Sequence, residues 1–206
     1  ATTELTDVSL ATGNLLALGP DAPSLSHEGI RFHLDGGRRM VYRDIRRFGR
    51  LEVLSDNQWE TRQQQLGVEP LSDEFTGELL HRLTRTSRVA IKTWLMDQRR
   101  VVGVGNIYAD EALFRAGIDP RRRANSLSRP RAQRLREAIQ AVLGEAIDFR
   151  GTTLLDYRDA SGEEGAFAGR LRVYDRAGQP CPVCGTPIRR IVQGGRSTFF
   201  CPRCQR

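Results

Sequence analysis

The segment Cys181-Pro-Val-Cys-Gly-Thr-Pro-Ile-Arg-Arg-Ile-Val-Gln-Gly-Gly-Arg-Ser-Thr-Phe-Phe-Cys-Pro-Arg-Cys204 contains every cysteine of the chain. The cysteines form two Cys-X-X-Cys pairs separated by sixteen residues, and they are Cys181, Cys184, Cys201 and Cys204. Two such pairs at opposite ends of a hairpin are typical of four thiolates around one structural zinc ion. Gly194-Gly195 lies between the pairs, where the hairpin turn is expected. The pattern predicts a zinc-binding β-hairpin over residues 176–206.

Two disulfides, or four free thiols, are the alternatives to a metal site. The sequence shows no signal peptide, so an oxidising compartment is not indicated, and the spacing favours zinc. A hairpin this small draws much of its folding free energy from the metal, and four protein ligands leave no coordination position open for catalysis. We therefore expect a structural ion, with Arg189, Arg190 and Arg196 presented to a partner at the hairpin tip.

The overall charge points to a polyanionic partner. The 206 residues carry a formal net charge of +7 with a pI near 9.9, and nucleic acid is the first candidate for such a chain. Six arginines and one acid lie between Arg38 and Arg50, and seven arginines and no acid lie between Arg121 and Arg136. Two clusters of positive charge favour a surface that contacts phosphates, because ordinary solvent-exposed surfaces carry charges of both signs. No run of eighteen apolar residues is present, which argues against a membrane-spanning helix.

The N-terminal part of the chain has the pattern of strands. Apolar residues alternate from Ile30 to Leu34 and again to Tyr42, with a turn signal at Asp35-Gly-Gly37 between them, which predicts a hairpin. Residues 49–54 fit one more strand, while residues 1–29 are weakly patterned. These strands are too few to close a sandwich of their own, so we expect a partial β-sandwich segment over residues 1–60.

From about residue 73 the apolar period becomes helical, which predicts a helical domain over residues 70–150. Ser87 is expected to cap its second helix. Asn106 is expected to cap a third, with acids in its early turns, and Gly117 to end it.

The longest helix is predicted to begin at Ser128 and Pro130 and to stop at Gly151. Small residues then indicate a loop region and linker over residues 151–175, with a short strand at residues 171–174. The predicted fold class is α+β: a partial β-sandwich segment, a helical domain and a C-terminal zinc hairpin.

The segment Val101-Val-Gly-Val-Gly-Asn-Ile-Tyr108 places two glycines just before a predicted helix. The N-terminus of a helix exposes backbone N–H groups and the positive end of its dipole, and glycines allow a phosphate backbone to approach closely. A plain turn between helices is the alternative. Beside two arginine clusters and a zinc hairpin, we interpret the segment as a phosphate-binding turn.

Four stretches resemble, in order, motifs of the bacterial formamidopyrimidine-DNA glycosylase family, which includes endonuclease VIII. Residues 91–97 followed by 101–111 are similar to its helix–two-turn–helix motif. The other three are Arg43-Asp-Ile-Arg-Arg-Phe-Gly49, similar to an arginine-phenylalanine loop; Gly151-Thr-Thr-Leu154 and the residues up to 173, similar to the lesion-capping loop region; and residues 180–201, similar to the family's zinc finger.

The resemblance implies a DNA base-excision repair protein that removes oxidised purines from duplex DNA and cleaves the strand by a lyase step, after flipping the damaged base out. It implies one zinc ion, damaged or abasic double-stranded DNA as partner, a monomer, and a bacterial, cytoplasmic and nucleoid-associated location. It assigns DNA contacts to Lys92, Asn106, Tyr108 and Arg196. It also assigns Arg46 and Phe48 to the hole left by the flipped nucleotide.

The catalytic residues are not assigned by the resemblance. The family nucleophile is an N-terminal proline followed by glutamate, whereas this sequence begins Ala1-Thr-Thr-Glu4. Three explanations stay open: a piece of a complete glycosylase, a truncated relative that binds DNA without chemistry, or the amine of Ala1 as nucleophile. Lys92, the only lysine of the chain, is a substitute nucleophile only if its pKa is depressed.

Three functions therefore compete. The first is a glycosylase with lyase activity, and the second is a zinc-dependent DNA-binding protein that performs no cleavage. The third is a structural or RNA-associated protein that uses the same basic scaffold.

Overall fold

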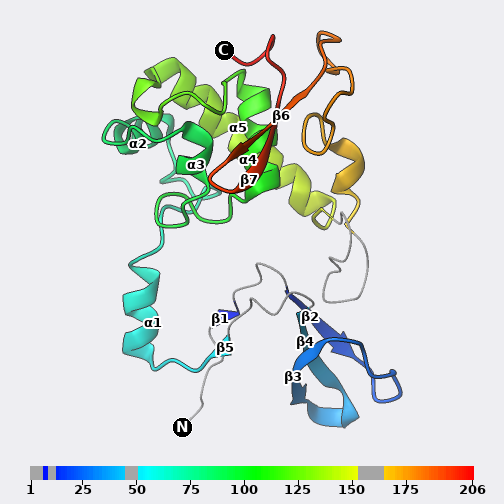
Figure 1. Ribbon diagram of the computed structural model, residues 1–206. Helices are drawn as coiled ribbons and strands as arrows, with labels where there is room; N and C mark the ends of the chain where they lie inside the picture. Colours follow the sequence, from blue (N-terminus) through cyan, green and yellow to red (C-terminus); the bar gives the residue numbers. More distant parts are fainter. Residues whose placement is uncertain (1–6, 9–12, 45–50, 153–164) are drawn as a thin grey trace. The chain divides into compact units, whose positions relative to one another are not determined.

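The computed structural model describes residues 7–8, 13–44, 51–152 and 165–206 (Figure 1). The chain forms two compact units, residues 1–63 with 146–169, and residues 64–145 with 170–206. Strands dominate the first unit, while the second holds helices and the C-terminal hairpin. The α+β fold class is confirmed. Among the described residues, no helix is both long enough and apolar enough to cross a membrane.

The first unit contains a three-stranded antiparallel sheet in the order β2-β4-β3. Its strands are β2 (Gly13–Leu18), β3 (Glu28–His33) and β4 (Arg39–Asp44). The predicted hairpin is confirmed, because Ile30 pairs with Tyr42 across β3 and β4. Strand β2 lies in the weakly patterned N-terminal region and was not predicted. It forms because β4 offers it a second edge, against which Leu16 becomes buried.

Two short strands and a helix complete the described part of this unit. Strand β1 (Asp7–Val8) pairs with β5 (Leu51–Glu52), so only two residues of the strand predicted over 49–54 lie in a described strand. Helix α1 (Asp56–Gln63) was not predicted because it has no apolar stripe, and no residue in it is buried. A local signal was present: the backbone N–H of Ser55 donates to Oε1 of Gln58 over 2.9 Å, as in a capping box.

The second unit is built on α2 (Gly77–Thr84), α3 (Ile91–Leu95), α4 (Asn106–Ala116) and most of α5 (Arg129–Asp148). Short 3₁₀ turns lie at η2 (Ala124–Ser126) and η3 (Phe167–Arg170), and another, η1 (Asp35–Gly37), forms the β3–β4 turn. Gly117 ends α4 with a φ of 68°, as predicted. Large apolar side chains from these helices form the core, among them Leu80, Trp94, Leu113 and Leu135.

Two predicted helix caps are wrong. Helix α3 begins after Ala90, and the carbonyl of Ser87 instead accepts a hydrogen bond from the N–H of Asn125. Helix α4 is preceded by Gly105, so Asn106 is its first helical residue and not its cap. Both polar side chains had the right chemistry for capping, but the tertiary fold gives those segments other partners.

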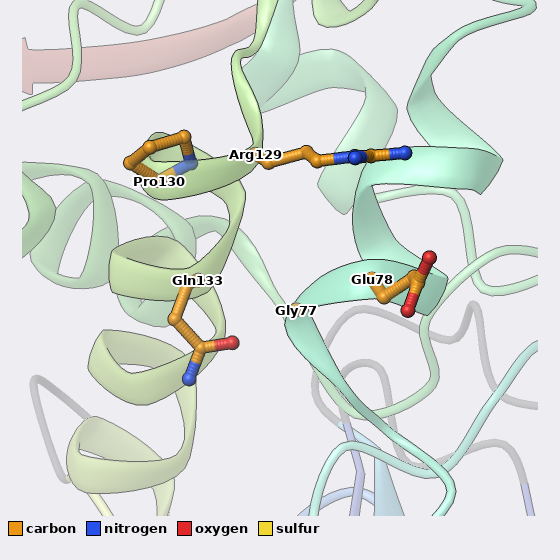
Figure 2. Close-up of a pocket in the computed structure, with 5 residues that line it drawn as sticks. All are labelled: Gly77, Glu78, Arg129, Pro130 and Gln133. Atoms are coloured by element: carbon orange, nitrogen blue, oxygen red, sulfur yellow. The ribbon is translucent and has the colours of Figure 1, made fainter.

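Helices α2 and α5 approach each other closely at their N-terminal ends (Figure 2). A Cβ at Gly77 would lie 2.8 Å from Cα of Gln133, so glycine is required at this approach. A pocket of about 330 Å³ opens beside it, lined by Gly77, Glu78, Arg129, Pro130 and Gln133.

The C-terminal hairpin consists of β6 (Arg189–Gln193) and β7 (Arg196–Phe200). Gly194 and Gly195 form its turn with φ values of 53° and 74°, as predicted. The hairpin tip carries Arg196. Arg189 and Arg190 lie at the opposite end of the ladder, paired with Phe200 and Phe199, so the prediction that they share the tip is wrong.

Candidate metal centre and nucleic-acid interface

The four cysteine sulfurs lie within 4.8 Å of one another. The Sγ atoms of Cys181 and Cys204 are 3.9 Å apart, and those of Cys184 and Cys201 are 3.5 Å apart. A tetrahedron with Zn–S distances of about 2.3 Å has S···S edges of about 3.8 Å, whereas a disulfide requires about 2.0 Å. The thiols are free, and their geometry fits a single zinc ion. This geometry confirms the predicted zinc site, and it does not fit the alternative of two disulfides.

The metal loops are part of the core of the second unit. Backbone N–H groups of Val183 and Cys204 donate to Sγ of Cys181 and Cys201, over 3.5 and 3.4 Å. Cys181 and Cys201 also pack in one apolar cluster whose other buried members are Phe114, Val173, Ile188 and Phe199. Because Phe114 belongs to α4, zinc binding holds the hairpin against that helix.

Helix α4 packs against α3 and β7 (Figure 1), and a buried ion pair links these elements. Nζ of Lys92 lies 2.9 Å from Oδ1 of Asp110, and both side chains are 0% exposed. The lysine also donates to the carbonyl of Ser197 and to Oγ1 of Thr198, each over 2.8 Å. The second carboxylate oxygen of Asp110 accepts the N–H of Phe199 over 2.9 Å. The pair therefore fastens the strand that begins at Arg196 to both helices.

Burial and the partner charge act oppositely on this pair. Burial raises the pKa of Asp110 to about 7, and the charge of Lys92 opposes that rise. Burial likewise lowers the pKa of Lys92, while Asp110 raises it. Each charged group thus depends on the other to remain ionised.

Lys92 differs from the expectation of a direct DNA contact. Its side chain has no exposed surface, and three oxygens of the protein take up its donors. A phosphate therefore has no access to it in this structure. The physical reason is that α3 packs beneath the hairpin, so a lysine in its first turn points into the interface and positions Arg196 indirectly.

The neighbouring acid, Glu111, is also fully buried, and it organises a distant segment. Its carboxylate accepts the backbone N–H groups of Arg172, Val173 and Tyr174 over 2.9–3.0 Å. This is why the short strand predicted at residues 171–174 is wrong: these N–H groups bond a side chain instead of a neighbouring strand. Asp110 and Glu111, the acids predicted in the early turns of α4, thus hold backbone segments, and neither lies in the first turn of the helix.

Tyr174 was not singled out from the sequence, although the structure places it at the predicted site. Nδ2 of Asn106 donates to its hydroxyl over 3.3 Å, and Oδ1 of Asn106 is buried with no hydrogen-bond partner among the described residues. The ring of Tyr174 packs edge-on against Phe199, with centroids 5.0 Å apart. The only sequence signal for Tyr174 was an aromatic side chain close to the zinc hairpin. Its contact with Asn106 could not be predicted, because the two residues are 68 positions apart.

The turn before α4 is held by one side chain, that of Gln98. Its Oε1 accepts the N–H of Gly103 over 2.8 Å, and its Nε2 lies 3.3 Å from the carbonyls of Met96 and Val104. Gly103 has a φ of 73°, and a Cβ there would meet no atom within 4 Å. The outer side of this turn is therefore open, while its inner side is fixed by Gln98.

We expect Gln98→Leu to loosen this turn and weaken DNA binding by about tenfold, because the three hydrogen bonds of the exposed Gln98 side chain are lost at about 0.5–1.5 kcal/mol each. Gln98→Glu keeps the acceptor for Gly103, and at about 200 mM salt, which screens the repulsion between its added charge and the phosphates, it should retain more of the affinity. Fluorescence anisotropy with an abasic duplex measures both variants. Equal losses in the two variants would contradict a specific role for the Gly103 hydrogen bond.

The remaining predicted residues are placed as follows. Tyr108 is half-buried in the first turn of α4, two residues after Asn106. Arg196 is exposed at the hairpin tip. Arg46 and Phe48 lie outside the described residues, as do most of the lesion-loop stretch and the N-terminal Glu4. The structure thus brings together α4, the glycine turn and the hairpin that bears Arg196.

Two family models match the chain. One is described as the formamidopyrimidine-DNA glycosylase H2TH domain and matches residues 66–157, and the other as the zinc finger found in FPG and IleRS, matching residues 178–206. Among curated proteins, the chain is 47% identical over 196 residues to a formamidopyrimidine-DNA glycosylase of Hahella chejuensis, covering 95% of this chain and 72% of that protein.

Solved structures agree with these matches. The MutM (Fpg) protein of Thermus thermophilus superposes with a TM-score of 0.86 at 42% identity, covering 96% of this chain and 74% of that one. A complex of the Lactococcus lactis Fpg with DNA containing an abasic site gives a TM-score of 0.87 at 33% identity, covering 97% and 74%. With identity of this extent over nearly the whole sequence, the chain belongs to the formamidopyrimidine-DNA glycosylase family.

Proposed function

We propose that this protein binds duplex DNA at damaged or abasic sites in base-excision repair, using the Gly103–Asn106 turn and Arg196 to hold phosphates. The observation that carries the proposal is that one helix serves both elements. The glycine turn leads into α4, and Asp110 on α4 pairs with Lys92 to fasten the strand that begins at Arg196. The phosphates of one DNA strand can therefore contact both the glycine turn and Arg196, because α4 holds both in place.

The chemistry of the turn suits a phosphate. The first N–H groups of an eleven-residue helix have no acceptor inside the helix, and they lie at the positive end of its dipole. The amide of Asn106 lies beside them and is oriented by Tyr174. The relative from Lactococcus lactis, described in complex with abasic-site DNA, supports an abasic duplex as the ligand of this surface.

Gly105 gives the sharpest test of this interface. Its φ of −91° and ψ of −173° suit any residue, and a Cβ there would meet no protein atom within 4 Å. The fold of this chain therefore has no need of glycine at this position, whereas a close-lying phosphate backbone does.

We expect Gly105→Ala to leave the free energy of unfolding within about 0.5 kcal/mol of the parent protein. Affinity for an abasic duplex should fall by about tenfold or more, because the added methyl group displaces the phosphate from the N–H groups. Gly144→Ala is the matched control, since its Cβ also meets no atom within 4 Å and it lies on α5. The interface would be misplaced if both variants bound DNA alike.

We further propose that the activity this site serves is removal of oxidised purines followed by strand cleavage. The family resemblance assigns the covalent step to an N-terminal proline and glutamate, and no residue of this sequence is assigned that role. Lys92 is a poor substitute because it is buried and paired with Asp110. The second candidate, DNA binding without cleavage, is supported by the roles proposed here, since each site residue among the described ones is proposed to hold DNA and none is proposed as a nucleophile.

Borohydride trapping on an abasic-site duplex separates these two candidates. A covalent adduct supports the lyase activity, and its absence together with tight abasic-site binding supports the binding protein. Competition between RNA and DNA duplexes at fixed salt tests the RNA-associated alternative, since A-form grooves suit a different surface. Equal affinity for abasic and undamaged duplexes would remove the recognition of damage from the proposal.

A further inference from the structure

A basic pocket of about 430 Å³ lies on the second unit, apart from the glycine turn. It is lined by Asp119, Arg121, Arg122, Arg123, Ser126 and Arg206. Four arginines against one aspartate leave a formal charge of +3 (4 − 1) in the lining. The pocket in Figure 2 has a different charge. Its lining contains one arginine, Arg129, and one acid, Glu78, so its formal charge is zero.

The single acid of the basic pocket is already neutralised. The carboxylate of Asp119 accepts the backbone N–H, Nε and Nη2 of Arg121 over 2.8, 3.0 and 2.6 Å. The Arg121 guanidinium in turn lies over the ring of Phe200, 4.9 Å from its centroid. Among the described residues, Arg122, Arg123 and Arg206 form no ion pair, so three guanidinium groups remain for an anionic ligand.

The pocket is joined to the hairpin that bears Arg196. The carbonyl of Pro120 accepts hydrogen bonds from the backbone N–H of Lys92 and from Nε2 of Gln193, over 3.3 and 3.4 Å. Gln193 is the cross-strand partner of Arg196 at the hairpin tip. On the other side, the N–H of Arg206 donates to the carbonyl of Gly117 over 3.1 Å. The pocket and the hairpin tip are therefore tied to the same segment after α4 through Pro120.

We propose that this pocket is a second phosphate-binding site, which takes a backbone phosphate of the bound duplex outside the lesion. The inference rests on the proposed function, because the duplex must first engage Arg196. Guanidinium groups bind phosphate through paired N–H donors, and a cluster with no unpaired acid matches a ligand of repeated negative charge. A free inorganic phosphate shares this chemistry and is separated from the duplex by the experiment.

The test compares Arg123→Gln/Arg206→Gln with a control of equal charge change, Arg82→Gln/Arg85→Gln at the C-terminal end of α2, outside both arginine clusters. All four side chains are exposed, so folding is not at risk. Dissociation constants for a 30-base-pair duplex with a central abasic site are measured between about 50 and 200 mM salt. We expect the slope of log K against log salt to fall in magnitude by about 1 to 2 in the pocket variant and to stay at the parent value in the control.

Equal slopes in the two variants would overturn the proposal. Loss of inorganic phosphate binding, measured by calorimetry, without a change in the duplex slope would also overturn it, because the pocket would then hold the free ion. A short duplex that covers only the lesion should bind the pocket variant and the parent protein equally. The preference of the parent protein for abasic over undamaged DNA is measured first. If it has none, the proposed function is refuted, and the pocket is still judged by the salt slopes.

Discussion

Removal of zinc is expected to abolish tight DNA binding while the helices of the second unit stay folded. Among the described residues, the hairpin is held by the four thiolates, a small apolar cluster and its contacts with α3, α4 and the segment that follows α4. Structural zinc contributes about 10–16 kcal/mol of apparent binding free energy to folding in small zinc-finger peptides. Without that contribution the strand that carries Arg196 loses its support, and a charge-assisted contact worth about 1.5–3 kcal/mol is lost with it.

Chelation of the metal, or Cys201→Ser, should therefore weaken abasic-duplex binding by about 10- to 100-fold. Circular dichroism should show most of the helical signal retained, since α2 and α5 contribute no zinc ligand. Val183→Ser is the matched control, because Val183 lies between two ligands but is 68% exposed. Unchanged affinity after verified removal of zinc would show that the hairpin does not hold the DNA.

Replacement of Lys92 by methionine is expected to be the most destabilising substitution of a charged side chain discussed here. It leaves the Asp110 carboxylate buried without its cation, a situation that costs about 3–5 kcal/mol. Asp110→Asn should cost a similar amount, because the ammonium of Lys92 is then unpaired. The double variant Lys92→Met/Asp110→Asn should recover much of the loss, since no buried charge remains and the amide oxygen still accepts the N–H of Phe199.

Urea unfolding of the parent, both single variants and the double variant measures this coupling. Arg99→Met is the matched control, because Arg99 pairs with Asp97 while its own side chain is 79% exposed, and such a pair contributes about 0–1 kcal/mol. Additive losses in the two Lys92–Asp110 single variants would contradict the buried ion pair. DNA binding of the folded double variant should fall less than that of either single variant, because the side chain at position 110 still holds Phe199. A direct contact by Lys92 would instead make the double variant as weak as Lys92→Met.

Whether a feature could be predicted from the sequence depends on how far apart along the chain the interacting residues lie. The zinc ligands, the Gly194-Gly195 turn and the end of α4 at Gly117 are local signals, since each depends on residues a few positions apart. Strand β2 was missed because its partner β4 lies more than twenty residues away and its own pattern is weak. The predicted cap at Asn106 is wrong because α4 already begins at that residue, while its amide nitrogen bonds Tyr174, 68 positions later.

The sequence by itself determined the metal, the glycine turn and the excess of arginine, because spacing and composition carry that chemistry whatever surrounds them. Only the tertiary structure decided what Asp110, Glu111 and Lys92 do. Lys92 and Asp110 pair with each other, and the other partners of the three residues lie 61 to 106 positions away. Burial turns three ordinary helix-surface residue types into fixed supports for Tyr174 and Arg196. A charge acquires such a role only when water is excluded from it, and that exclusion is a property of packing, which no local pattern records.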